Sequence, residues 1–96
     1  MKAYRVRYPP EAAGRIRKLH PEVKQEIREA IRTLRDAPLT GHLLQQELFG
    51  YRSCRMRTYR IIYRLNDDDR TIDVVFVGPR RNVYEDLLSL VRRNSS

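Results

Sequence analysis

Residues 71–77, Thr-Ile-Asp-Val-Val-Phe-Val, restrict the possible folds of this chain more than any other segment does. The run is apolar on both faces of a strand, through Ile72, Val74, Val75, Phe76 and Val77. A strand of this kind is typical of the interior of a sheet, where both faces are covered. Gly78 and Pro79 then end the run. The sequence therefore predicts a sheet with a central strand at 71–77.

Three further segments are predicted strands. Residues 3–8 and 59–65 alternate between aromatic or aliphatic side chains and arginines, which is the period of a half-buried strand. Residues 52–56 form the third strand, joined to 59–65 by a tight turn near Arg57. The polar run 66–69 is a turn by composition. The last three strands therefore follow one another as a meander.

Helical spacing appears in three places. A short helix is expected after Pro9 and Pro10 and runs to His20, because proline is tolerated in a first turn. A second, amphipathic helix begins at Pro21 and ends near Asp36, and residues 37–50 read as a loop. A last helix, capped by Asn82 or a neighbour, has its apolar positions at Val83, Tyr84, Leu87, Leu88 and Val91.

The order of these elements is β-α-α-β-β-β-α. It predicts an α+β fold, in which a helical hairpin packs on a mostly antiparallel four-stranded sheet with a C-terminal helix. Ninety-six residues leave room for a single domain, 1–96.

The charge balance points to an anionic partner. The chain has 20 Lys and Arg residues against 12 Asp and Glu residues, a formal net charge of +8, and most of its cations are arginine. A guanidinium forks onto phosphate oxygens with two hydrogen bonds and stacks on bases. We expect the chain to bind polyanions, acidic proteins, or both.

Many of the arginines are concentrated around the predicted meander. No acidic residue lies between Leu48 and Asn66, yet five arginines do, and two more follow the strand at 71–77: Arg52, Arg55, Arg57, Arg60, Arg64, Arg80 and Arg81. They are expected to converge mostly on one open face of the sheet. A merely solvated charged face is the alternative, but like charges on neighbouring strands repel, which favours a binding site.

Other chemistry is sparse. Tyr84 either fills core space or serves as a general base or a stacking platform. His20 and His42 have no obvious partner and are interpreted as structural or incidental. Cys54 stands alone, so no disulfide within the chain is expected. Asp67 to Asp69 lie in an exposed turn that would chelate poorly, and we expect no metal and no cofactor. No apolar run resembles a signal peptide or a membrane span, and a cytoplasmic location is expected.

Three segments resemble the RelE/ParE toxin superfamily, and its RelE-like branch in particular. They are Gly-Tyr-Arg-Ser-Cys-Arg-Met at 50–56, Thr-Tyr-Arg-Ile-Ile-Tyr-Arg at 58–64, and Val-Gly-Pro-Arg-Arg-Asn-Val-Tyr at 77–84. The Tyr-Arg-Ile-Ile-Tyr strand and the Val-Gly-x-Arg-Arg-x-Val-Tyr ending are the most specific parts. With the element order, the resemblance spans residues 3 to about 91.

The resemblance implies an endoribonuclease that cuts messenger RNA in the ribosomal decoding site without a metal. The substrate's 2′-hydroxyl attacks the adjacent phosphate, leaving a cyclic phosphate and a 5′-hydroxyl. By motif, Arg60 matches the arginine that steadies the phosphate, Arg80 the one that helps the leaving oxygen, and Tyr84 the tyrosine of proton transfer or stacking.

The phosphate-binding residues implied by the resemblance are Arg52, Arg55, Arg57 and Arg81. Two basic residues normally alternate on the strand before Arg60; Arg55 fits one position, while the other falls on Ser53, where Arg52 or Arg57 is expected to substitute. The implied partners are a cognate antitoxin, messenger RNA and the ribosome. Two alternatives stay open: a ParE-type inhibitor of DNA gyrase, and a non-catalytic RNA-binding relative.

Overall fold

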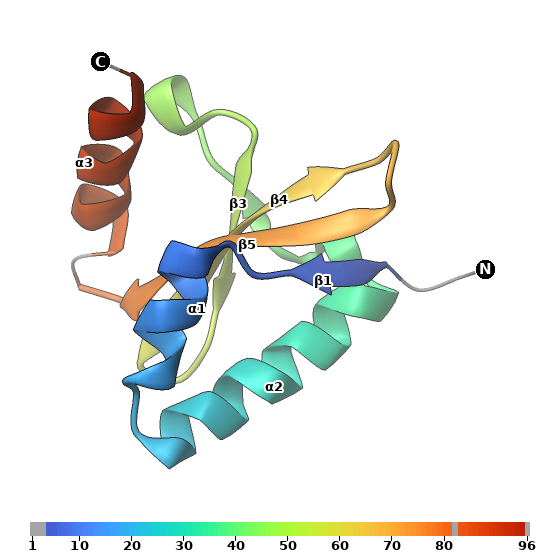
Figure 1. Ribbon diagram of the computed structural model, residues 1–96. Coiled ribbons are helices and arrows are strands. Elements are labelled where there is room, and N and C mark those ends of the chain that lie inside the picture. Colours follow the sequence, from blue (N-terminus) through green and yellow to red (C-terminus); the bar gives the residue numbers. More distant parts are fainter. Residues whose placement is uncertain (1–3, 82, 96) are drawn as a thin grey trace.

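The computed structural model describes residues 4–81 and 83–95. In these residues the elements follow the order β1 (Arg5–Arg7), α1 (Pro10–Arg17), α2 (Pro21–Asp36), β2 (His42–Leu43), β3 (Tyr51–Arg55), β4 (Tyr59–Asn66), β5 (Thr71–Pro79) and α3 (Val83–Ser95) (Figure 1). Short 3-10 turns at Pro38–Thr40 and Gln46–Leu48 flank β2. Within the described residues, no helix is long and apolar enough to cross a membrane.

The sheet confirms the predicted α+β class and differs in one strand. Its order is β1-β5-β4-β3-β2, with β1 parallel to β5 and all other pairs antiparallel. The apolar run of β5 lies between β1 and β4, so the predicted internal strand is confirmed. The described residues make five strands rather than the predicted four. The additional strand, β2, lies within residues 37–50, which were predicted to be a loop. A strand of two residues is too short to show any period.

The helix bounds follow the prediction closely at α2 and less closely at α1. α1 ends at Arg17 rather than His20. His20 instead caps α2, where its Nδ1 accepts a hydrogen bond from the Glu22 backbone N–H (3.1 Å). This capping contact confirms the structural reading of His20. Asn82, offered by the sequence as a cap for α3, lies outside the described residues.

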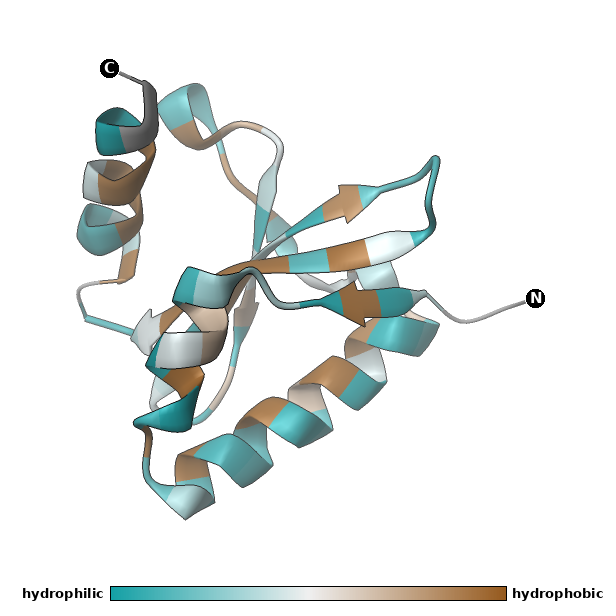
Figure 2. Ribbon diagram, in the orientation of Figure 1, coloured by the Kyte–Doolittle hydropathy of each residue, from teal (hydrophilic) through white to brown (hydrophobic). Residues whose placement is uncertain are grey.

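Two clusters of buried side chains cover the two faces of the central strands. On one face, α2 contributes Ile27, Ile31 and Leu34, which pack with β4 and β5. On the other, α3 contributes Val83, Leu87 and Leu90. Figure 2 shows the apolar positions that recur along both helices. Residues on β4 alternate between the two clusters, and a β-bulge falls where Ile62 gives way to Tyr63.

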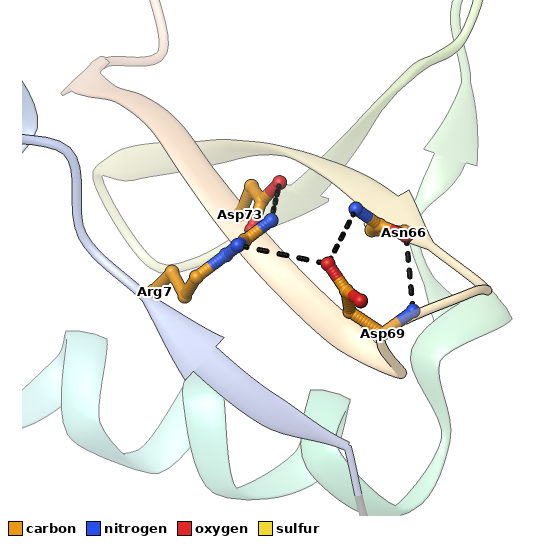
Figure 3. Close-up of polar contacts among 4 residues, drawn as sticks. All are labelled: Arg7, Asn66, Asp69 and Asp73. Carbon is orange, nitrogen blue, oxygen red and sulfur yellow. Dashed lines mark hydrogen bonds and ion pairs between the residues drawn. The ribbon is translucent and has the colours of Figure 1, made fainter.

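A polar network fastens the short strand β1 to the sheet (Figure 3). Arg7 donates two hydrogen bonds to the Asp73 carboxylate, from Nε (2.7 Å) and Nη2 (3.0 Å). Its Nη1 also lies 3.9 Å from Asp69, whose carboxylate accepts from Asn66. The hydrogen bonds from Arg7 hold the pKa of the Asp73 carboxyl below its ordinary value. The network therefore joins β1, β5 and the β4–β5 turn.

Candidate functional site

A cleft of about 430 Å³ opens between β2, β3, β4 and α3. We call it the Ser53 cleft; its lining residues are Thr40, His42, Ser53, Cys54, Arg55, Arg60 and Tyr84. Among the residues that the structure describes, no carboxylate lines it. The cleft is therefore positively charged, and it contains two of the three residues predicted as catalytic.

Ser53 forms the centre of this cleft. It is 2% exposed, and its Oγ accepts hydrogen bonds from Arg60 Nη1 (3.0 Å) and from the Tyr84 hydroxyl (3.1 Å). The Arg60 guanidinium carbon also lies 5.3 Å from the centre of the Tyr84 ring, within the range of a cation–π contact. Arg60 and Tyr84, which are 24 positions apart in sequence, thus donate to the same hydroxyl.

The strand register explains how the cleft forms. Arg55 on β3 lies directly opposite Arg60 on β4, and Ser53 is two residues from Arg55, so all three point to the same face. Tyr84 reaches that face because α3 begins close to the end of β5. At Gly78 the absence of a side chain leaves room for the Phe76 ring, since a Cβ there would lie 2.9 Å from Phe76 Cε1.

The electrostatics of the cleft suit an anion. Arg55 and Arg60 are like charges on directly opposite positions, an arrangement that destabilises a sheet. The Nε of Arg60 is buried and has no hydrogen-bond partner among the described residues. A phosphate bound in the cleft would offset the repulsion between these two guanidiniums.

Cys54 is not a candidate nucleophile. Burial raises the pKa of its thiol, and the nearby Arg60 offsets this only in part. The thiol therefore stays protonated near neutral pH, and a protonated thiol is a poor nucleophile. Within the described residues, no three or more His, Cys, Asp or Glu side chains gather as a metal-binding group.

Two of the predicted phosphate-binding arginines lie elsewhere, which corrects the expected convergence on one face. Arg52 is three residues from Arg55 and so points to the opposite face, where its Nη1 donates to the Gly41 carbonyl (2.9 Å). Arg57, in the β3–β4 turn, forms an ion pair with Glu26 of α2 (3.5 Å). Neither residue substitutes for a basic side chain at Ser53.

Arg80 and Arg81 lie in the turn after β5 and do not line the Ser53 cleft. The Arg80 backbone N–H donates to the Thr58 carbonyl (3.1 Å), which ties this turn to the β3–β4 turn. Arg80 is half-buried and Arg81 is exposed. The structure thus joins Arg60, Arg55 and Tyr84 in one cleft and leaves the paired arginines outside it.

His42 lines the cleft, although it was interpreted from the sequence as structural or incidental. It lies on β2, opposite Ser53 of β3. No periodic pattern could have found it, because β2 has two residues and its position depends on pairing with β3. Only the register of a completed sheet places this histidine.

Comparisons with known proteins agree with the residue motifs. A family model described as the ParE toxin of the parDE type II toxin–antitoxin system matches residues 4–84. Toxin RelG of Mycobacterium tuberculosis is 35% identical over 83 residues, which cover 84% of this chain and 95% of RelG. The chain belongs to the RelE/ParE toxin superfamily. The resemblance found from the sequence is therefore confirmed, and the chain is a RelE-like toxin of a toxin–antitoxin system.

Solved structures of this superfamily share the fold. The toxin–antitoxin complex RelBE2 of Mycobacterium tuberculosis contains a chain that matches with a TM-score of 0.75 and 35% identity, over 81% of this chain and 99% of that one. A doubly substituted E. coli RelE in the free state matches with a TM-score of 0.78, over 96% and 97% of the two chains. At 18% identity, this second superfamily member supports the fold alone.

Proposed function

We propose that this toxin is a metal-independent endoribonuclease that cuts messenger RNA on the ribosome. In the proposed reaction the 2′-hydroxyl attacks the adjacent phosphate, and the products carry a cyclic phosphate and a 5′-hydroxyl. The observation that supports this activity most is the shared bonding of Arg60 and Tyr84 to Ser53 in a cleft lined by no carboxylate of the described residues.

The proposed roles follow from the charge that develops during phosphoryl transfer. Negative charge concentrates on the non-bridging oxygens, and guanidiniums already in place stabilise it without reorganising. Arg60 would bind these oxygens through its guanidinium, and Arg55 would bind the same or the neighbouring phosphate. Tyr84 would take part in proton transfer or stack on a base.

Arg80 and Arg81 are proposed to act from outside the cleft. Arg80 follows Gly78, the register partner of Arg60, by two residues. We assign Arg80 to the leaving oxygen and Arg81 to a flanking phosphate once RNA is bound. Arg52 and Arg57 are assigned structural roles instead, because each already contacts a protein partner on another face.

We further propose a cognate antitoxin as the partner of this chain, and the cytoplasm as its location. The relatives RelBE2 of Mycobacterium tuberculosis and RelBE of E. coli are both toxin–antitoxin complexes. A net charge of +8 favours an acidic partner, since complementary charge speeds association and suppresses wrong pairings.

Inhibition of DNA gyrase is the second candidate function, and a specific observation favours it. The matching family model is that of the ParE toxin. Arg80 and Arg81 also lie outside the Ser53 cleft, which leaves the catalytic set implied by the RelE resemblance incomplete in the free chain.

One experiment compares two arginines of the same strand. Arg60→Gln removes a cleft guanidinium, whereas Arg64→Gln removes one that stacks on Tyr51 (5.3 Å) away from the cleft. On ribosomes programmed with messenger RNA, we expect Arg60→Gln to lower the cleavage rate about 100-fold and Arg64→Gln to change it only slightly. Cleavage is measured by primer extension.

The outcomes separate the candidate functions. Wild-type protein that leaves messenger RNA intact and instead abolishes supercoiling by purified gyrase would establish the ParE-type function. A non-catalytic relative would bind RNA with an affinity that falls as salt rises, but would not cleave RNA at any ribosome concentration.

A further inference from the structure

Apart from His42, the described residues that line the Ser53 cleft offer no obvious acceptor for the proton of the 2′-hydroxyl. Arginine and tyrosine side chains ordinarily keep their protons near neutral pH and act as hydrogen-bond donors. The Tyr84 hydroxyl already donates to Ser53, and the Arg60 Nη1 does the same. Attack by the 2′-oxygen requires a group that accepts a proton at neutral pH. Imidazole is the side chain best suited to that exchange.

His42 is the imidazole that the sheet brings to this cleft. It is the register partner of Ser53, and side chains of directly opposed antiparallel residues lie on the same face about 4.5–5.5 Å apart at Cβ. The next pair along, Leu43 and Arg52, lines a separate pocket on the opposite face, which agrees with this alternation. His42 is exposed, so a bound RNA could reach it.

The backbone before His42 is held more firmly than a two-residue strand would be on its own. The Gly41 N–H donates to the hydroxyl of the fully buried Tyr63 (2.9 Å), and that hydroxyl donates to the Pro38 carbonyl (2.7 Å). Arg52 also donates to the Gly41 carbonyl. A Cβ at position 41 would lie 2.7 Å from the Tyr63 ring atom Cε1, so only glycine allows this close approach. These contacts fix the backbone that carries His42 opposite Ser53.

We propose that His42 is the general base of the cleavage reaction, an inference that rests on the proposed ribonuclease function. The 2′-hydroxyl proton passes to the neutral imidazole while the 2′-oxygen forms a bond to phosphorus. The bond from phosphorus to the 5′-oxygen breaks, and the 5′-oxygen takes a proton from Tyr84. Proton transfer through solvent from His42 to Tyr84 restores both groups. The products are a 2′,3′-cyclic phosphate and a 5′-hydroxyl, with all atoms accounted for.

The test uses the full chain on ribosomes programmed with messenger RNA, under single-turnover conditions. His42→Ala is expected to lower the cleavage rate at saturating toxin by about 100-fold and to leave the toxin concentration at half-maximal rate nearly unchanged. Free imidazole in the buffer is expected to restore part of the rate. The matched control is His20→Asn, which removes the other histidine of the chain and keeps a good N-cap residue.

A second substrate assigns the role of each group. In a substrate whose scissile 5′-oxygen is replaced by sulfur, the leaving group needs no protonation. The defect of Tyr84→Phe should then shrink, while the defect of His42→Ala should persist because the 2′-hydroxyl still needs a base. A His42→Ala defect that also shrinks would overturn the assignment as base.

The outcomes keep the inference distinct from the proposed function. Wild-type cleavage with an equally fast, normally folded His42→Ala variant overturns the role of His42 and leaves the ribonuclease function standing. The role of His42 as base is also overturned if the His42→Ala variant cleaves at the wild-type rate once the toxin is saturating, because the defect then lies in binding. A wild-type chain that leaves messenger RNA intact overturns the ribonuclease function, and the role of His42 with it.

Discussion

At the scale of single residues, Ser53 decides how the cleft is organised. A basic residue at this position would be the third beside Arg55 and Arg60 and would add to their repulsion. The serine hydroxyl instead accepts from Arg60 and Tyr84 and holds both side chains in one orientation. Preorganisation of this kind is what a charged transition state requires of its binding groups.

Two arginines of β3 provide a matched test of which guanidiniums contact RNA. Arg55→Ala and Arg52→Ala each remove one positive charge, but Arg55 lines the cleft and Arg52 lies on the opposite face. We expect Arg55→Ala to make the plot of log RNA-binding constant against log salt concentration less steep, by about 0.7 in the magnitude of its slope. Arg52→Ala should leave the slope unchanged and lower the free energy of unfolding by about 1.5–3 kcal/mol. Equal salt slopes for the two variants would contradict the assignment.

The roles of individual residues could be predicted from the sequence only where a motif carried them. The motif selects Arg60 and Tyr84 together, and the structure brings them together at Ser53. Whether Arg52 or Arg55 faces the cleft depends on which face of β3 is covered, a long-range property that a local pattern does not contain. His42 could not be found at all, since its position comes from pairing across the sheet.

At the scale of elements, predictability follows length. The strand β4, the strand β5 and the helix α2 extend over enough residues to show their periods, and each lies within two residues of its predicted bounds. The strands β1 and β2 are three and two residues long, and their places in the sheet are fixed by contacts with distant residues instead.

The contact that fixes β1 is pH-sensitive. Because Arg7 depresses the pKa of Asp73, this carboxylate stabilises the fold above the ordinary pKa of aspartate, near 3.9, and the stabilisation is lost as pH falls through the depressed value. Asp73→Asn should therefore unfold at lower urea than wild type at pH 7, and the difference should diminish at pH 3. The control is Asp68→Asn, an exposed residue of the adjoining turn. A difference that grows on acidification would refute this account.

At the scale of the whole molecule, the order of elements was enough to predict the fold class, but not the order of strands. The meander of β3, β4 and β5 follows from short connections. The parallel pairing of β1 with β5 joins residues near the N-terminus to Thr71–Asp73, and nothing in either strand's own pattern specifies it. Packing of α2 and α3 on opposite faces then gives the two buried clusters.

The overall charge leads to a prediction about the antitoxin complex. If an acidic partner neutralises the net charge of +8, the association rate should fall steeply as salt rises from about 50 to 200 mM, whereas dissociation should change little. Stopped-flow or surface-based kinetics with the co-expressed partner would measure both rates. An association rate independent of salt would show that apolar contacts, rather than charge, guide the encounter.

The shortness of the two edge strands has a consequence for the protein when it is alone. An exposed sheet edge offers unpaired N–H and C=O groups on which another chain can assemble. Here one edge strand has three residues, two of them arginines, and the other has two. Neither is long enough to seed a growing stack of identical chains. A toxin freed from its partner is thus expected to resist aggregation through these two strands.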